Sequence, residues 1–338
     1  MTLKELAQKL GLSASTVSKA LNDSYEISND TKQRVRDLAD MYKYKPNILA
    51  KSLKTGRSNT IGVIIPYLSN PFQSQILEGA HQAAYDSNYK LIFMQSRENI
   101  ELEQDSLQAL CMQNIDGIII SPCANSCVKY LKQISLQVPL VLVDRIDYDL
   151  DTHKIGVDNE KGAYLATQHL IDMGRKDILL LSVQNIGVTN KRIVGYKKAL
   201  LANYLDFKEE YIISVEYEQA KDNLITNLTH LLAKKLNEFN HPIGLLGTTD
   251  TLTVGSLGIL SNLGVAVPEQ VAVVGFANTE AADSMNPALS TVVQPAKQMG
   301  YQAVEKLVEL IHHRKRLHAD FDTIVLESTL VPRKSTVS

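Results

Sequence analysis

The sequence predicts an α/β protein with a small helical domain at its N-terminus and a larger body that contains two parallel sheets. The first sixty residues place apolar side chains at helical spacing. They carry a net charge of +5, from eight Lys and three Arg against four Asp and two Glu. From Thr60 onward, short β-branched runs alternate with helical patterns of roughly 12 to 16 residues, as in βαβ units. The 338 residues also exceed the usual size of a single domain.

The N-terminal domain is predicted to contain three helices. The first begins behind a capping box of Thr2 and Glu5 and ends at Gly11, and the second begins behind Ser13 and runs to about Asn22. Two short helices around a tight turn match the geometry that places the second helix in a DNA major groove, although any small three-helix bundle has the same pattern. The apolar positions at helical spacing are Leu3, Leu6, Ala7, Leu10, Val17, Ala20, Leu21, Val35, Leu38, Ala39 and Tyr42.

The outward positions of that second helix are the candidate base readers. Ala14, Ser15, Ser18 and Lys19 are expected to lie opposite Val17. Small hydroxyls can approach base edges or phosphates, and the Lys19 ammonium suits the acceptors of guanine. The basic charge of this end favours a polyanionic partner, although a solvated tail would carry the same charge.

The body alternates predicted strands and helices, and their number implies two sheets. Buried strands are predicted at 61–65, 91–94, 117–120, 140–143, 155–157, 178–181, 212–215, 243–246 and 271–274. Helices are predicted at 72–85, 101–112, 161–173, 191–202 and 253–263. The stretch from 295 to 331 is expected to add one more helix and a closing strand pair.

Several classes of protein and site are disfavoured. No apolar run has the length of a signal peptide or a membrane span, so we expect a cytoplasmic protein. Cys123 and Cys127 stand at C-x3-C spacing without further ligands nearby, so we predict neither a metal site nor a cofactor. Dinucleotide, P-loop, nucleophile-elbow and zincin motifs are absent, so we expect no enzyme. A triad of Ser121, Asp144 and His169 could be drawn, but His169 lies in the middle of a predicted helix.

A short segment between Pro46 and Gly56 carries the start and stop signals of a helix of about two turns. Helices of this length are marginal in water, so this one should need a partner helix or DNA to remain folded. Its basic residues could neutralise phosphates while Leu53 wedges between base pairs in the minor groove. The alternative is a simple charged linker.

Polar residues follow the predicted strands, at the edge where parallel sheets bind ligands. Hydroxyl, amide, carboxylate and guanidinium groups around an aromatic ring suit a polyhydroxylated, sugar-like ligand. Simpler alternatives exist: Asn70 could form only a turn, Asp144 could pair with Arg145, and Asp158 and Asp250 could cap helices. The candidate ligand-binding positions are Ser69, Asn70, Phe72, Ser96, Ser121, Asp144, Arg145, Asp158, Arg192, Thr249, Asp250, Ala277 and Gln294.

Short strings of residues stand in a fixed order along essentially the whole chain. They are 2–7, 13–22, 44–47, 50–56, 70–72, 116–119, 143–145, 158–159, 195–196, 274–276 and 294–295. On these strings the chain resembles the lactose-repressor/galactose-repressor (LacI/GalR) family. The resemblance implies a two-lobed body like that of periplasmic binding proteins. It also implies a DNA-binding transcription regulator, expected to be a repressor, whose operator affinity is controlled allosterically by a small, sugar-like effector.

The expected domains are a helix-turn-helix domain at 1–45, a hinge helix and linker at 46–59, and an effector-binding and dimerisation domain at 60–338. The first lobe is expected at about 60–158 and 292–320, and the second at about 159–291 and 321–333. The expected partners are a palindromic double-stranded operator, a sugar or sugar derivative and a second copy of the chain, with no membrane. The alternative is a periplasmic-type sugar receptor without a DNA role, for which the basic helical domain would have no use.

Carried over residue by residue, the resemblance assigns roles at the DNA. Ala14 and Ser15 would discriminate the operator, and Ala50 would pack against the hinge of the second copy. Lys19 stands where the family usually has Arg, so its readout of guanine would be looser. Ser13, Thr16, Ser18 and Asn22 would mainly position phosphates. The full candidate set is Thr2, Leu3, Ser13, Ala14, Ser15, Thr16, Ser18, Lys19, Asn22, Tyr44, Asn47, Ala50 and Leu53.

The resemblance also marks the ligand site and two departures from it. Arg192 stands where the family has its ligand-binding Arg. Thr249 replaces a common Asn before Asp250, and Ala277 replaces a common Asp. Without that carboxylate the site loses an acceptor for paired sugar hydroxyls. A different sugar, a phosphorylated or acidic ligand, or a non-sugar effector therefore remain alternatives, and Asn278 could compensate in part.

Overall fold

The computed structural model describes residues 1–44, 57–184, 187–216, 221–313 and 320–337. The chain divides into two compact units, Met1–Ser58 and Asn59–Ser338, and each is described by itself. The predicted hinge positions Asn47, Ala50 and Leu53 lie outside the described residues.

Three helices form the N-terminal unit around a small apolar core, as the spacing of apolar residues predicts. They are α1 (Leu3–Leu10), α2 (Ala14–Leu21) and α3 (Asn29–Met41). Gly11 ends α1 in the left-handed conformation, with φ of 65°, which a glycine adopts without strain. The core consists of Leu6, Ala7, Val17, Ala20, Val35 and Ala39. Leu3 and Tyr44, both predicted to contact DNA, are half-buried against this core.

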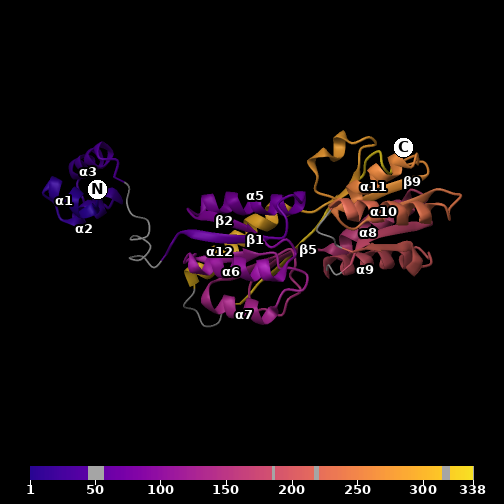
Figure 1. Ribbon diagram of the computed structural model, residues 1–338, viewed down its shortest axis with the longest axis horizontal. Helices are drawn as coiled ribbons and strands as arrows, with labels where there is room; N and C mark the ends of the chain where they lie inside the picture. The colour runs from indigo at the N-terminus through magenta and orange to yellow at the C-terminus, as the bar shows by residue number, and fades with distance from the viewer. Residues whose placement is uncertain (45–56, 185–186, 217–220, 314–319, 338) are drawn as a thin grey trace. The chain divides into compact units, whose positions relative to one another are not determined.

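The first lobe of the body is a six-stranded parallel sheet in the order β11-β5-β4-β3-β1-β2. Its strands are β1 (Thr60–Ile65), β2 (Lys90–Gln95), β3 (Gly117–Ile120), β4 (Leu140–Val143), β5 (Lys154–Val157) and β11 (Thr323–Leu326). One face is covered by α5 (Pro71–Asp86) and α12 (Ala296–His313). The other face is covered by α6 (Ile100–Met112) and α7 (Val128–Gln137) (Figure 1).

Two glycines let α5 and α12 pack backbone against backbone. A Cβ added at Gly79 would lie 1.9 Å from the carbonyl oxygen of Lys297, and a Cβ added at Gly300 would lie 1.9 Å from that of Ile76. No larger residue fits at either position without moving a helix.

The second lobe is another six-stranded sheet, in the order β12-β10-β9-β8-β6-β7. Its strands are β6 (Ile178–Val183), β7 (Ile212–Val215), β8 (Ile243–Gly247), β9 (Val271–Phe276), β10 (Ser290–Val293) and β12 (Thr329–Val331). Its two faces are covered by α8 (Asn159–Asp172) with α9 (Gly187–Ala202), and by α10 (Lys221–Leu236) with α11 (Asp250–Asn262). Short 3-10 helices are η1 (Glu209–Tyr211) and η2 (Glu280–Ser284). Among the described residues no helix is long and apolar enough to cross a membrane.

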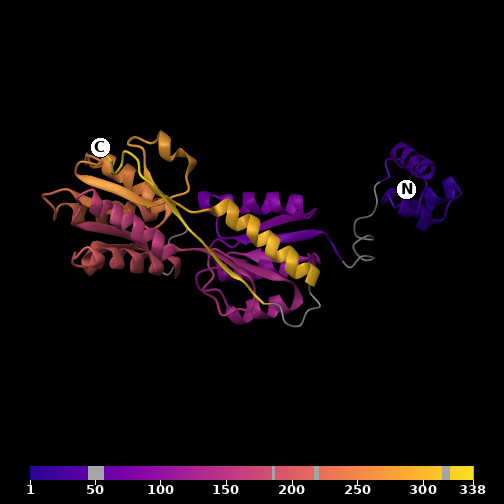
Figure 2. The same ribbon diagram turned by 180° about the vertical axis from the view of Figure 1, so that it is seen from behind.

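The C-terminal segment corrects the expected boundaries of the lobes. The closing strand pair expected in the second lobe at 321–333 does not form, because β11 pairs with β5 of the first sheet and only β12 joins the second. Strand β10 belongs to the second sheet, whereas the sequence predicts its last two residues, 292 and 293, in the first lobe. β12 also runs antiparallel to β10, so the second sheet is not fully parallel. Figure 2 shows the yellow C-terminal segment passing from one lobe to the other.

Candidate functional site

The surface of α2 carries most of the predicted base readers. Val17 and Ala20 are fully buried in the core of the unit, whereas Ser15 and Lys19 on the opposite side are exposed. Ala14 does not lie fully outward as predicted: it is half-buried against the core, because it stands one helical turn before Val17. The exposed side of α2 therefore offers hydroxyl groups and one ammonium group, which suit base edges and phosphates.

Several predicted DNA-binding residues also hold the ends of these helices. The Ser13 hydroxyl accepts a hydrogen bond from the backbone N–H of Thr16 at 3.0 Å, and the two hydroxyl oxygens lie 2.8 Å apart. Thr2 caps α1, and Asn22 donates from Nδ2 to the carbonyl oxygen of Ser18 at 2.8 Å. These contacts give the three capping side chains, Thr2, Ser13 and Asn22, a role in the fold in addition to any contact with DNA.

An acidic residue that sequence analysis missed lies beside the exposed side of α2. Oε2 of Glu26 accepts a hydrogen bond from Nζ of Lys19, although the two residues are seven positions apart. Helical spacing does not predict this contact, because the loop after α2 folds back to make it.

In the body, polar side chains from both lobes are buried together. We call this group the buried polar cluster. Five of its members are predicted ligand-binding residues: Ser121, Asp144, Arg192, Asp250 and Gln294. The other four are Gln73, Asn159, Thr248 and Asn278. Polar groups are costly to bury unless they are bonded, so their concentration here marks a candidate binding site.

Asp144 is the carboxylate that the first lobe contributes to the cluster. Its Oδ2 accepts hydrogen bonds from Nε2 of Gln73 at 2.9 Å and from Oγ of Ser121 at 3.3 Å. Burial raises the pKa of Asp144, and the positive charges of Arg145 and Arg192 oppose that rise. Because Arg192 belongs to the second lobe, this electrostatic interaction links the two lobes.

Arg192, on α9, is the buried cation of the cluster. Its Nε donates to Oδ1 of Asn159 at 2.8 Å, Nη2 lies 3.3 Å from Oε1 of Gln294, and Nη1 donates to the carbonyl oxygen of Thr248. The guanidinium carbon lies 3.7 Å from the centre of the Phe276 ring, a cation–π contact. Burial lowers the pKa of Arg192 to about 10, so the group remains charged at neutral pH.

Asn278 connects the lobes through its amide group. Its Nδ2 donates to Oε1 of Gln75 on α5 at 2.8 Å, and Nε2 of Gln75 donates back to the carbonyl oxygen of Asn278 at 3.0 Å. Oδ1 of Asn278 accepts from the backbone N–H of Gln294 at 3.0 Å. The amide of Asn278 is thus hydrogen-bonded to protein groups of both lobes.

Asp250 is the second carboxylate of the cluster. Its Oδ1 accepts from the backbone N–H of Asn278 at 2.7 Å. Burial raises the pKa of Asp250 to about 6, although this hydrogen bond and the charge of Arg192 act in the opposite direction. Three other polar atoms of the cluster are buried and have no hydrogen-bond partner among the residues that the structure describes: Oε1 of Gln73, Oγ1 of Thr248 and Nε2 of Gln294. Such atoms are expected where a ligand supplies the missing bonds.

Some predicted ligand-binding residues cap helices. Asn70 caps α5, accepting from the backbone N–H of Phe72 at 2.9 Å. Asp158 caps α8 and Thr249 caps α11. Phe72 itself is part of the apolar core of the first lobe. Asp158 thus has the capping hydrogen bond that the simpler alternative predicts, whereas Asp250 is the first residue of α11 and not its cap.

The remaining predicted residues lie apart from the cluster or bond differently than expected. Arg145 does not pair with Asp144 but with Glu98, in an ion pair that is almost entirely buried. Ser96 is fully buried, Ser69 is exposed, and Ala277 is buried with its N–H 3.3 Å from the carbonyl oxygen of Val292.

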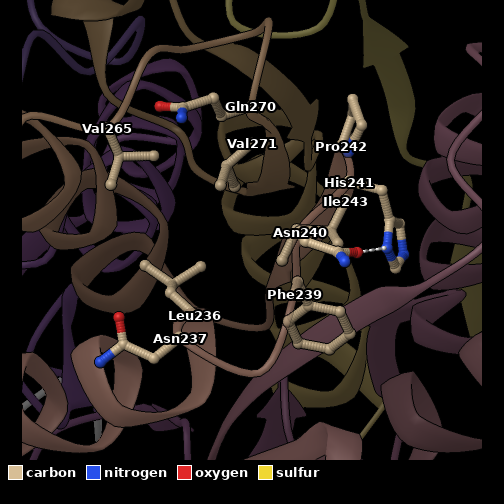
Figure 3. Close-up of a pocket in the computed structure, with 10 residues that line it drawn as sticks. All are labelled: Leu236, Asn237, Phe239, Asn240, His241, Pro242, Ile243, Val265, Gln270 and Val271. Carbon is tan, nitrogen blue, oxygen red and sulfur yellow. Dashed lines mark hydrogen bonds between the residues drawn. The ribbon is translucent and has the colours of Figure 1, made fainter.

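A separate hollow lies at the edge of the second sheet where strands β8 and β9 begin (Figure 3). The buried polar cluster lies at the other edge, where these strands end. The volume of the hollow is about 320 Å³, and Ile243 and Val271, where β8 and β9 begin, form part of its wall. Nδ1 of His241 lies 3.3 Å from Oδ1 of Asn240, and Nε2 lies 2.8 Å from Oδ2 of Asp177. None of the predicted site residues that the structure describes lines this hollow, so the buried polar cluster is the better candidate for the effector site.

Comparison with known proteins identifies relatives over the full length of the chain. Residues 2–47 match the family described as bacterial regulatory proteins, lacI family, and residues 167–336 match a periplasmic binding protein-like domain. The chain is 32% identical to the HTH-type transcriptional regulator RegA of Clostridium saccharobutylicum, over 99% of each protein. It is 28% identical to the ribose operon repressor of Haemophilus influenzae, over 100% of this chain and 99% of the relative. Both relatives are named as regulators of transcription.

A solved structure shares the fold. The lac repressor dimer bound to operator and the anti-inducer ONPF superimposes with a TM-score of 0.85 at 24% identity, over 100% of this chain and 99% of that chain. The expected two-lobed fold is thereby confirmed. Together with the full-length relatives, these matches confirm the resemblance: the chain belongs to the lacI family of bacterial regulatory proteins, which are DNA-binding transcription regulators.

Proposed function

We propose that this regulator binds a palindromic operator as a homodimer, and that a small, neutral, polyhydroxylated effector in the buried polar cluster controls its affinity for DNA. The observation that carries the effector proposal is the environment of Arg192. Its guanidinium is buried against Phe276. Beside it, Oγ1 of Thr248 and Nε2 of Gln294 find no hydrogen-bond partner in the described part of the chain. Sugar hydroxyls both donate and accept, so they can satisfy a hydroxyl and an amide together.

The charge of the cluster favours a neutral effector over a phosphorylated or acidic one. Asp144 and Asp250 are two buried carboxylates, and among the described residues beside them Arg145 is already paired with Glu98, whereas Arg192 forms no ion pair. An anionic ligand would add negative charge where two carboxylates are already costly to bury. Hydroxyl groups can instead donate to the carboxylates. The ribose operon repressor among the relatives supports a sugar as the class of effector.

A thermal-shift assay tests the effector proposal with neutral monosaccharides and their phosphates, D-ribose and D-ribose 5-phosphate among them. We expect a neutral sugar to raise the melting temperature of the wild-type chain. Arg192→Lys should lose this shift, because Lys keeps the charge but not the planar set of donors. Arg175→Lys, a control outside the cluster, should retain it. A shift produced only by phosphorylated ligands would contradict the proposal, and turnover of any sugar would contradict a purely regulatory role.

Dimerisation and the hinge are tested by separate measurements. We expect sedimentation at micromolar concentration to give the mass of two chains, because half-site recognition requires a twofold assembly. A mass of four chains would contradict the dimer. Leu53→Gly should abolish specific DNA binding and leave that mass unchanged, since Leu53 is proposed to act only on the minor groove. Unchanged specific affinity would refute the hinge role.

A further inference from the structure

The loop between α2 and α3 carries two carboxylates that face different helices. Asp23 lies 2.8 Å from Nη2 of Arg36 and 3.1 Å from Nζ of Lys32, and both cations belong to α3. Glu26 pairs instead with Lys19 on α2. The loop therefore holds two acidic groups of the same charge, of which only Glu26 contacts the helix that is expected to read DNA.

Backbone hydrogen bonds hold the loop in this form. The N–H of Ser24 donates to the carbonyl oxygen of Lys19 at 3.0 Å, and the N–H of Ile27 donates to that of Ser24 at 3.2 Å. Ile27 packs against the core of the unit. These contacts turn the chain back over the end of α2 and keep Glu26 beside Lys19.

The pair between Lys19 and Glu26 contributes little to the stability of the fold. The two side chains are 48% and 46% exposed, and ion pairs with this exposure are weak in water. Helix α2 is already held by its cap at Ser13 and by its buried face. The effect of the pair should therefore appear where the solvent around it is displaced, which is at a DNA interface.

We propose that Glu26 is a specificity-determining residue of the DNA interface that acts by positioning Lys19. The proposal rests on the predicted base-reading role of Lys19. A lysine ammonium is a rotatable point charge with three donors, and guanine recognition gains from donors held in one direction. When Glu26 accepts one of the three, the other two are directed toward the O6 and N7 acceptors of a guanine.

The Glu26 carboxylate also acts on DNA directly. It repels the phosphates that dominate non-specific binding. Removing its charge should strengthen binding to any sequence and weaken discrimination between sequences. A general charge effect alone would change both affinities alike.

The test compares the full-length chain on two DNA probes. One is a duplex that the wild-type chain selects from a random library, and the other is a scrambled duplex of equal length and base composition. We expect Glu26→Gln to lower the ratio of the two affinities about tenfold, the range of one base contact. Repeated selection with this variant should lose its preference at one G·C pair. Asp23→Asn removes the same charge from the same loop and should leave the ratio unchanged.

A second variant separates positioning from charge. Glu26→Gln is also made in a chain that carries Lys19→Met. Without Lys19, the substitution should leave the ratio of the two affinities the same as in Lys19→Met alone. Partial unfolding does not imitate the expected result, because it reduces both affinities by one factor. The proposal is overturned if Glu26→Gln keeps the wild-type ratio, if Asp23→Asn lowers it equally, or if the loss persists without Lys19.

Discussion

Replacing Asp250 with asparagine should change how the stability of the protein depends on pH. The carboxyl group is buried, and burial raises its pKa from 3.8 to about 6. Asparagine has nearly the same shape and retains an oxygen that can accept from the backbone N–H of Asn278, the bond that Asp250 makes at 2.7 Å. The variant therefore removes the titration while keeping the contact.

The raised pKa of Asp250 determines whether stability rises or falls with pH. A raised pKa means that between about pH 4 and pH 6 the folded protein binds this proton more tightly than the unfolded chain. Stability of the wild type is therefore lost as pH rises through that window. The cost of the charged carboxylate is about 1 kcal/mol near pH 4.5 and about 3 kcal/mol near pH 7.5, at 1.36 kcal/mol per pKa unit.

Urea unfolding of both proteins at one chain concentration measures this difference. The stability of Asp250→Asn relative to wild type should increase by about 2 kcal/mol between pH 4.5 and pH 7.5. All other titratable groups are common to both proteins and cancel. In Asp23 the hydrogen bond from Lys32 lowers the pKa, so Asp23→Asn should show no such increase. A relative stability of Asp250→Asn that is constant or falls with pH would refute the reasoning.

Two further pairs of substitutions, each a test and its control, probe the helix packing and the cap of α2. Gly79→Ala places a Cβ 1.9 Å from the carbonyl oxygen of Lys297 and should cost about 1 to 3 kcal/mol or more in urea unfolding. A Cβ added at Gly258 meets no atom within 4 Å outside the backbone of its own helix, so Gly258→Ala should raise the free energy of unfolding by about 1 kcal/mol. Equal effects of the two glycine substitutions would contradict this packing. Ser13→Ala removes the cap of α2 and should cost about 1 kcal/mol, measured as faster hydrogen exchange in α2, whereas exposed Ser15→Ala should exchange like wild type.

Local signals predicted most of the fold. Capping residues such as Thr2 and Ser13, together with apolar spacing, located the N-terminal helices, and β-branched runs located the parallel strands. Helices α7 and α10 were missed. In α7 the residue at the N-cap, Cys127, makes no capping hydrogen bond, so the usual start signal is absent. The sheet that β11 joins depends on which strand edge is free, and no local pattern contains that information.

The site was predicted only in part, because one side-chain chemistry serves two purposes. The carboxylate of Asp144 and the hydroxyl of Ser121 follow strands and reach the cluster, whereas Asn70 and Thr249 follow strands and cap helices. Gln73 joins the cluster through contacts made only after the lobes form, and nothing in its sequence neighbourhood distinguishes it.

The way the chain crosses between the lobes has a consequence for synthesis on the ribosome. Until residues 323–331 emerge, β5 and β10 are both edge strands with unpaired backbone groups. The residues just after them add to the closure, since Thr336 bonds to both His169 and Ser290 at 2.8 and 2.7 Å. One late segment therefore completes both sheets. During synthesis the edge of β5 stays open from about residue 157 until β11 is made, and the edge of β10 stays open from about residue 293 until β12 is made, so the two lobes finish folding together.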